Sequence, residues 1–133
     1  MTVPSTPQVA AQLATFFDAT NRDVAAAYLF GSVGRSAAHE SSDIDVAVLL
    51  ERDPPRTLDG LQLDLAQELE ELLGRRVDLV LLNHAAADLA HRVLRDGILV
   101  CDRNRSARIR FEVRIRNEYF DLEPVRKQYR RAG

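Results

Sequence analysis

The feature that most constrains this chain is a pair of short apolar segments, joined through a Gly-Ser turn, of which the second carries two aspartates. Residues 24–30 are apolar apart from one tyrosine and predict a buried strand, which Gly31-Ser32 follows directly. After ten further residues, Asp43–Leu50 predicts a second strand in which aspartates alternate with apolar side chains. The chain therefore combines a turn of small residues with a pair of carboxylates.

The Gly31-Ser32 turn suits an anionic ligand. Glycine lets a backbone approach a ligand closely. If Ser32 begins a helix, its hydroxyl and the free backbone N–H groups of the first turn can bind a phosphate. A plain strand-to-helix turn would use the same two residues, so this pair alone leaves both interpretations open.

The aspartates suit a divalent metal ion. Side chains two apart on a strand share a face and lie ~6.6 Å apart along it, where the carboxylates of Asp43 and Asp45 repel one another. A cation such as Mg²⁺, which prefers oxygen ligands and is often shared with substrate phosphates, makes the pair favourable. Asp78 lies in a third predicted strand over 76–82. If that strand neighbours the second, three carboxylates can hold two metals for a phosphoryl displacement, with Asp78 accepting a proton. Solvent-facing strand positions are the alternative.

Four further elements are expected from periodicity and end signals. They are a helix that starts at residues 5–7, a leucine-striped helix over 58–72 ending at Gly74, a helix over 86–95 and a strand over 98–101. The last segment is ambiguous, because apolar residues alternate over 109–115 as in a strand. Phe111, Ile115 and Tyr119 are also spaced for one face of a helix, and the pattern alone leaves both open.

Composition indicates one domain with an uneven charge. The 133 residues are 46% apolar, and the net charge of −2 combines −8 over residues 1–102 (16 acidic, 8 basic) with +6 over 103–133 (4 acidic, 10 basic). There is no ~20-residue apolar run and no signal-peptide pattern. Cys101 is the only cysteine, which excludes an internal disulfide and fits a cytoplasmic protein. The absence of CxxC and HExxH motifs argues against structural zinc.

Together these residues resemble a known signature. Gly31-Ser32, ten residues, then Asp43-x-Asp45 is similar to the motif of the DNA polymerase beta-type nucleotidyltransferase superfamily. Residues 77–83, 94–100 and 116–121 resemble the minimal nucleotidyltransferases within it, and the resemblance extends from about residue 24 to 130. It implies an α/β (α+β) polymerase beta-like fold, in which a small mixed sheet is flanked by helices and the tail forms a C-terminal helix. Residues 1–133 would be one nucleotidyltransferase domain.

The resemblance also implies an activity and a partner. Minimal nucleotidyltransferases are commonly antitoxins paired with HEPN-domain ribonuclease toxins, and they transfer AMP from ATP to a toxin tyrosine using Mg²⁺. By position, Gly31 and Ser32 would hold the triphosphate. Asp43, Asp45 and Asp78 would form the metal-binding catalytic triad.

Arg35 lies where many relatives carry arginine, and it could contact phosphate or the acceptor. Relatives often have glycine next, whereas this chain has Ser36. His39 lies in the same loop and could contact nucleotide, although a solvated position is the simpler expectation. Surface positions are expected for His84 and His91.

Two other functions compete with protein adenylylation. One is a binding-only antitoxin that blocks its toxin through the basic segment 103–133, without catalysis. The other is a small-molecule nucleotidyltransferase of the aminoglycoside type, for which 133 residues leave little room for an acceptor-binding second domain. The arginines of the tail could bind RNA, but few aromatic residues and an acidic body favour partner docking over nucleic-acid or membrane binding.

Overall fold

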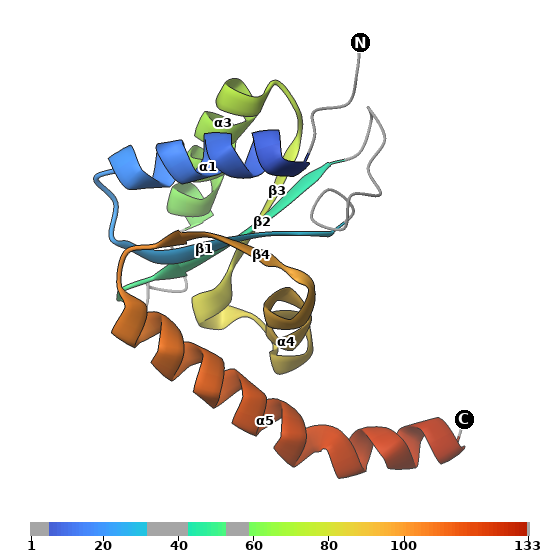
Figure 1. Ribbon diagram of the computed structural model, residues 1–133. Coiled ribbons are helices and arrows are strands. Elements are labelled where there is room, and N and C mark those ends of the chain that lie inside the picture. Colours follow the sequence, from blue (N-terminus) through green and yellow to red (C-terminus); the bar gives the residue numbers. More distant parts are fainter. Residues whose placement is uncertain (1–5, 32–42, 53–58, 133) are drawn as a thin grey trace.

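A computed structural model describes residues 6–31, 43–52 and 59–132. Within them, four strands form one mixed sheet in the order β3-β2-β1-β4, with helices on both faces (Figure 1). The strands are β1 (Val24–Phe30), β2 (Ile44–Leu50), β3 (Val77–Leu81) and β4 (Ile98–Asp102). The helices are α1 (Thr6–Ala19), α3 (Asp59–Leu73), the 3₁₀ turn η1 (Leu82–His84), α4 (Ala87–Asp96) and α5 (Arg105–Ala132).

Strand β1 is the centre of the sheet. All seven of its residues are buried, as expected for a strand covered on both faces, and it pairs antiparallel with both β2 and β4. Strands β2 and β3 are parallel, and a parallel pair needs a crossover connection. Helix α3 lies in that crossover, so the leucine-rich helix of the sequence is what allows β3 to lie beside β2.

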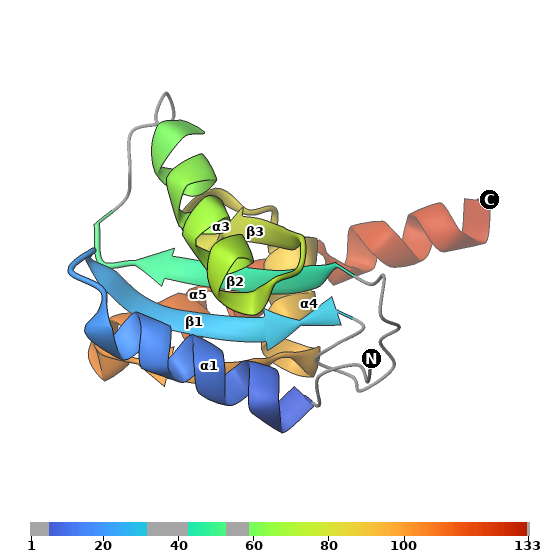
Figure 2. The ribbon, with the colours of Figure 1, turned by 90° about the horizontal axis from the view of Figure 1, so that it is seen from above.

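Helices α1 and α3 cover one face of the sheet (Figure 2). Val9, Leu13 and Phe17 are at most 1% exposed and lie four residues apart, which places them on one side of α1. Leu65 and Leu69 of α3 are fully buried in the same cluster. The predicted apolar stripes of both helices therefore form this half of the core.

Helices α4 and α5 cover the opposite face. Phe111 and Ile115 of α5 are buried there, whereas Ile109 and Val113 are 42% and 49% exposed. Helical spacing, and not strand alternation, thus describes the tail, and the helix implied by the resemblance is confirmed. Pro124 lies inside α5, where it removes one backbone hydrogen bond, and Figure 1 shows the helix changing direction toward its C-terminal end.

A polar network ties α5 to the sheet. The Tyr28 hydroxyl on β1 donates to Glu112 Oε1 over 2.9 Å. Arg108 pairs with Glu112 at 3.0 Å and with Asp102 of β4 at 2.9 Å. Burial, and then the hydrogen bond to Glu112, raises the pKa of Tyr28 well above its usual range, so the phenol stays protonated.

Most helix and strand ends differ by one residue from the sequence predictions. The strand predicted over Asp43–Leu50 begins at Ile44, whose N–H bonds to the carbonyl of Arg76 at the entry to β3. The strand predicted over 76–82 ends at Leu81, because Leu82 begins η1. Its side chain is buried in the apolar cluster on the side of the sheet covered by α4 and α5. The helix that the leucine stripe predicted spans Asp59–Leu73, and Gly74 ends it with a φ of +65°.

No helix in the described ranges is both long and apolar enough to cross a membrane.

We expect Ile115→Ala and Ile109→Ala, two identical substitutions on α5, to affect stability very differently. Ile115 is 2% exposed, so its truncation leaves a cavity and should lower the free energy of unfolding by about 2–5 kcal/mol. Ile109 is 42% exposed, and its truncation should change that free energy by no more than about 0.5 kcal/mol. Urea unfolding followed by circular dichroism measures both. Equal effects would contradict the orientation of α5.

Candidate active site

Two of the predicted site residues lie side by side on the sheet. Asp45 of β2 is in register with Asp78 of the parallel strand β3 and, on its other side, with Phe30 of β1. Neighbouring strands lie ~4.8 Å apart, and residues in register project to the same face. Asp45 is half-buried and Asp78 is exposed. The 33-residue separation of the two carboxylates in sequence, from 45 to 78, is thus closed by strand pairing.

Gly31, directly after β1, lies against the carboxylate of Asp45. Its φ of +73° is in the left-handed region that side chains other than glycine rarely adopt. A Cβ atom added at Gly31 would overlap that carboxylate and lie 2.8 Å from Asp45 Cγ. Both the backbone conformation and the lack of a side chain are therefore required for Asp45 to occupy its position.

These residues line a cavity of about 300 Å³ at the end of the sheet where β1 stops and β2 and β3 begin. The cavity is lined by Phe30, Gly31, Asp45, Asp78, Val80, Leu89, Arg92 and Asp96. The last three come from α4, where intervals of three and four residues place them on one side of the helix. Helix α4 therefore forms the wall of the cavity opposite the strands.

Arg92 and Asp96 were not predicted as site residues from the sequence. Asp96 accepts two hydrogen bonds from Arg95. The donors are Nε and one terminal nitrogen of Arg95, and each lies 2.9 Å from a carboxylate oxygen of Asp96. The available signal was that Leu89, Arg92 and Asp96 are spaced for one side of a helix. That spacing points to the site only once α4 is known to line the cavity. That position follows from tertiary packing and not from a local pattern.

The other predicted site residues lie elsewhere or outside the described ranges. Asp43 is exposed, precedes β2 by one residue and does not line the cavity. Among the described residues, no three His, Cys, Asp or Glu side chains are grouped to hold a metal ion, so the three-carboxylate cluster stays a prediction. Ser32, Arg35 and His39 lie outside the described ranges.

Of the remaining histidines, His84 is exposed, as expected. His91 is half-buried instead of lying free on the surface, because its ring stacks on Tyr119 of α5 at 3.7 Å.

The residues present fit a divalent cation. The cavity has hard carboxylate oxygens from two adjacent strands, and the absent side chain of Gly31 makes the space in which one of them lies. Oxygen-only donor sets of this kind favour Mg²⁺ over softer metals. Asp45 and Asp78 are the strand carboxylates of the cavity lining that would hold it.

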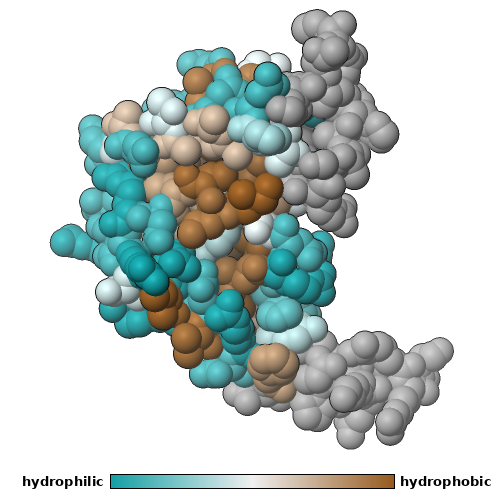
Figure 3. Space-filling model, in the orientation of Figure 1, coloured by the Kyte–Doolittle hydropathy of each residue, from teal (hydrophilic) through white to brown (hydrophobic). Residues whose placement is uncertain are grey.

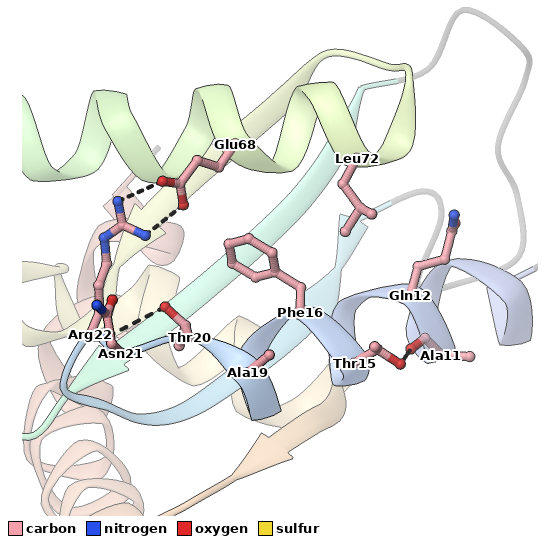
Figure 4. A pocket seen from close by; sticks show the side chains of 10 residues that line it. All are labelled: Ala11, Gln12, Thr15, Phe16, Ala19, Thr20, Asn21, Arg22, Glu68 and Leu72. Atoms are coloured by element: carbon pink, nitrogen blue, oxygen red, sulfur yellow. Dashed lines mark hydrogen bonds and ion pairs between the residues drawn. The ribbon is translucent and has the colours of Figure 1, made fainter.

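A larger hollow, about 750 Å³, lies between α1 and α3 (Figure 4). Figure 4 shows Phe16 and Leu72 facing into it, beside the paired Arg22 and Glu68. The hydrogen bonds between these two, 2.5 and 2.9 Å, raise the pKa of Arg22 and lower that of Glu68. None of the carboxylates of the smaller cavity lines this hollow, which is mainly apolar and lies on the other face of the sheet.

Replacing Gly31 by alanine should displace Asp45 and weaken divalent-cation binding. The added methyl group overlaps the carboxylate and the backbone is held at positive φ, so we expect at least a tenfold loss of Mn²⁺ affinity, about 1.4 kcal/mol. Isothermal titration with Mn²⁺ measures this. Gly60→Ala is the matched control, since nothing lies within 4 Å of its Cβ position in α3 and its cation affinity should be unchanged. Unchanged Mn²⁺ affinity in Gly31→Ala would contradict the contact.

Comparison with known proteins adds sequence and structural relatives. The family model "Polymerase beta, Nucleotidyltransferase" matches residues 12–106. Over 71 residues, which are 53% of this chain, the sequence is 42% identical to the protein adenylyltransferase MntA of Shewanella oneidensis. The match spans about half of that curated relative's length, 48%.

Two solved structures resemble the whole fold. A crystal structure of a toxin–antitoxin with AMP-PNP matches with a TM-score of 0.76 and 27% identity, covering 90% of this chain and 94% of the other. A structure of tri-AMPylated Shewanella oneidensis HEPN toxin in complex with MNT antitoxin matches with a TM-score of 0.70 and 25% identity, covering 93% and 94%. From the matched residues and the shared architecture, the chain belongs to the polymerase beta nucleotidyltransferase family.

Proposed function

We propose that the protein is a Mg²⁺-dependent adenylyltransferase that moves AMP from ATP to a tyrosine of a cognate HEPN toxin and so acts as its antitoxin. The observation that carries this proposal is the pair Asp45 and Asp78, in register on parallel strands and facing a cavity beside Gly31. The similarity to MntA and to the complex with an AMPylated toxin supports the choice of AMP and of a protein acceptor. With one buried cysteine and no second in the chain, action in the reducing cytoplasm fits the same proposal.

The reaction is an in-line displacement at the α-phosphorus of ATP. The tyrosine oxygen forms a bond to that phosphorus while the bond to the oxygen bridging the α- and β-phosphates breaks. Pyrophosphate leaves with the electron pair of the broken bond, and the tyrosine proton passes to a carboxylate, for which Asp78 is our candidate. Nothing is oxidised or reduced, so ATP and the acceptor are the only substrates.

The chain's residues take distinct roles in this proposal. Asp43 and Asp45 hold Mg²⁺, and Asp78 completes the metal site. Bound Mg²⁺ neutralises charge that develops on the phosphates. Gly31, Ser32 and Arg35 contact the triphosphate in this proposal. For Gly31 the supporting observation is its place in the lining of the cavity, beside the carboxylate of Asp45.

The segment 103–133 is our candidate for toxin docking. Ile109, Val113 and Phe120 of α5 are 42%, 49% and 64% exposed, and their spacing places them on one side of the helix. Figure 3 shows hydrophobic side chains along this outward side of α5, with hydrophilic ones around them. Exposed apolar residues in a segment of charge +6 suit a partner surface that is apolar at its centre and acidic at its rim.

The double variant Asp43→Asn/Asp45→Asn should lose AMP transfer and keep its fold. Amides retain the size of the carboxylates but not the charge that binds Mg²⁺, so we expect transfer to fall at least about a hundredfold. The intact mass of a purified toxin partner after incubation with ATP and Mg²⁺ measures this. No AMP added by the wild type would refute the enzymatic proposal. Full protection of cells by the double variant would favour a binding-only antitoxin.

Val113→Asp and Phe120→Asp should weaken the complex with the toxin. A charge introduced into an apolar contact must be desolvated, so each change should raise the Kd at least tenfold, about 1.4 kcal/mol. Leu63→Asp is a matched control, because Leu63 is 65% exposed and lies on α3, across the sheet from α5. Surface plasmon resonance compares the three. Equal affinities would exclude the outward side of α5 as the docking surface.

A further inference from the structure

Arg92 is the one cationic residue among the described residues that line the Asp45–Asp78 cavity. It is exposed and lies on α4, facing the sheet residues across the cavity. Three carboxylates line the same space, Asp45, Asp78 and Asp96. Arg92 nevertheless forms no ion pair or hydrogen bond with any residue in the described ranges.

Several other arginines of the fold pair with carboxylates. Arg95, three residues further along α4, donates two hydrogen bonds to Asp96, and Arg22 donates two to Glu68. Arg108 pairs with both Asp102 and Glu112. Arg92 thus keeps its five N–H donors available within the cavity, whereas Arg95, its neighbour on the same helix, donates to Asp96.

A cation bound by the strand carboxylates would make the surroundings of Arg92 less negative. Asp96 is balanced by Arg95, and the two carboxylates of Asp45 and Asp78 would be balanced by one divalent cation. The guanidinium of Arg92, which pairs with no residue in the described ranges, would then favour an anion in the cavity. A guanidinium matches phosphate in shape, since its parallel N–H groups can bond two oxygens at once.

The size of the space is consistent with a phosphate chain. The cavity is about 300 Å³, at the lower end of the ~300–1,000 Å³ of small-molecule sites. Gly31, Asp45 and Asp78 form its strand side and Arg92 its helix side. A polyphosphate in the cavity could then interact with a cation held by Asp45 and Asp78 and also with the guanidinium of Arg92.

We propose that Arg92 is a phosphate-binding residue that holds the β- and γ-phosphates of the nucleotide, the group that leaves as pyrophosphate. This inference rests on the proposed nucleotidyl transfer and assigns α4 a direct part in it. Because negative charge accumulates on the leaving group as the bridging bond breaks, a guanidinium on that side stabilises the transition state as well as the bound substrate.

The test compares two nucleotides that differ in their phosphate chain. With Mg²⁺ present, Arg92→Ala should bind AMP-PNP about tenfold or more weakly than the wild type, as expected for loss of a charge-assisted hydrogen bond. Its affinity for AMP should change less than about twofold, which isolates the effect to the β- and γ-phosphates. Arg92→Lys should recover part of the lost affinity for AMP-PNP, because it restores the charge without the planar fork.

A matched control removes the same charge far from the cavity. Arg52 is exposed and lies two residues beyond β2, about 23 Å along the chain from Asp45 in extended geometry. Arg52→Ala should leave both affinities unchanged. Isothermal titration measures the affinities, and circular dichroism of each variant establishes that it is folded.

The outcomes separate this inference from the proposed function. If Arg92→Ala is folded and binds AMP-PNP as tightly as the wild type, Arg92 has no phosphate-binding role, while AMP transfer by the wild type would still support the enzyme. If the wild type binds AMP-PNP but adds no AMP to the toxin, protein adenylylation is refuted and the nucleotide comparison still decides the role of Arg92. An equal loss of AMP and AMP-PNP binding would also overturn the assignment to the phosphate tail.

Discussion

The contact between the backbone of Gly31 and the carboxylate of Asp45 is the constraint on which the site depends. Strand β1 ends immediately before Gly31, and the left-handed backbone there leaves the space that Asp45 occupies. The parallel pairing of β2 with β3 then brings Asp78 alongside. One missing side chain and one strand register therefore determine where the two carboxylates meet. Helix α3 makes that register possible, and helix α4 lines the cavity beside it.

The two faces of the sheet contribute differently to the core and to the site. The side covered by α1 and α3 holds the larger part of the apolar core, and its broad hollow is remote from the carboxylates. The side covered by α4 and α5 combines a smaller apolar cluster with the cavity and the Tyr28–Glu112–Arg108 network. Substitutions on the first side should act mainly on stability, whereas those on the second can also change the site.

Much of this organisation could be predicted from the sequence, because it depends on local patterns. The buried run 24–30, the alternation around Asp45 and the leucine stripe ending at Gly74 correspond to β1, β2 and α3. The strand order could not be predicted from local pattern, and neither could the position of α4 over the end of the sheet. For that reason Asp78 was identified only conditionally, and Arg92 was not identified at all. Period alone also left the tail undecided until the burial of Phe111 and Ile115 distinguished helix from strand.

The crossover through α3 has a consequence for how the site forms. Asp45 and Asp78 are separated by the whole of that helix, so they meet only after the chain has closed a loop of 33 residues and laid β3 against β2. Such non-local pairing is costly in chain entropy and tends to come late in folding. A nascent or partly unfolded chain therefore lacks the paired carboxylates altogether. A reaction that needs both carboxylates therefore requires the completed fold.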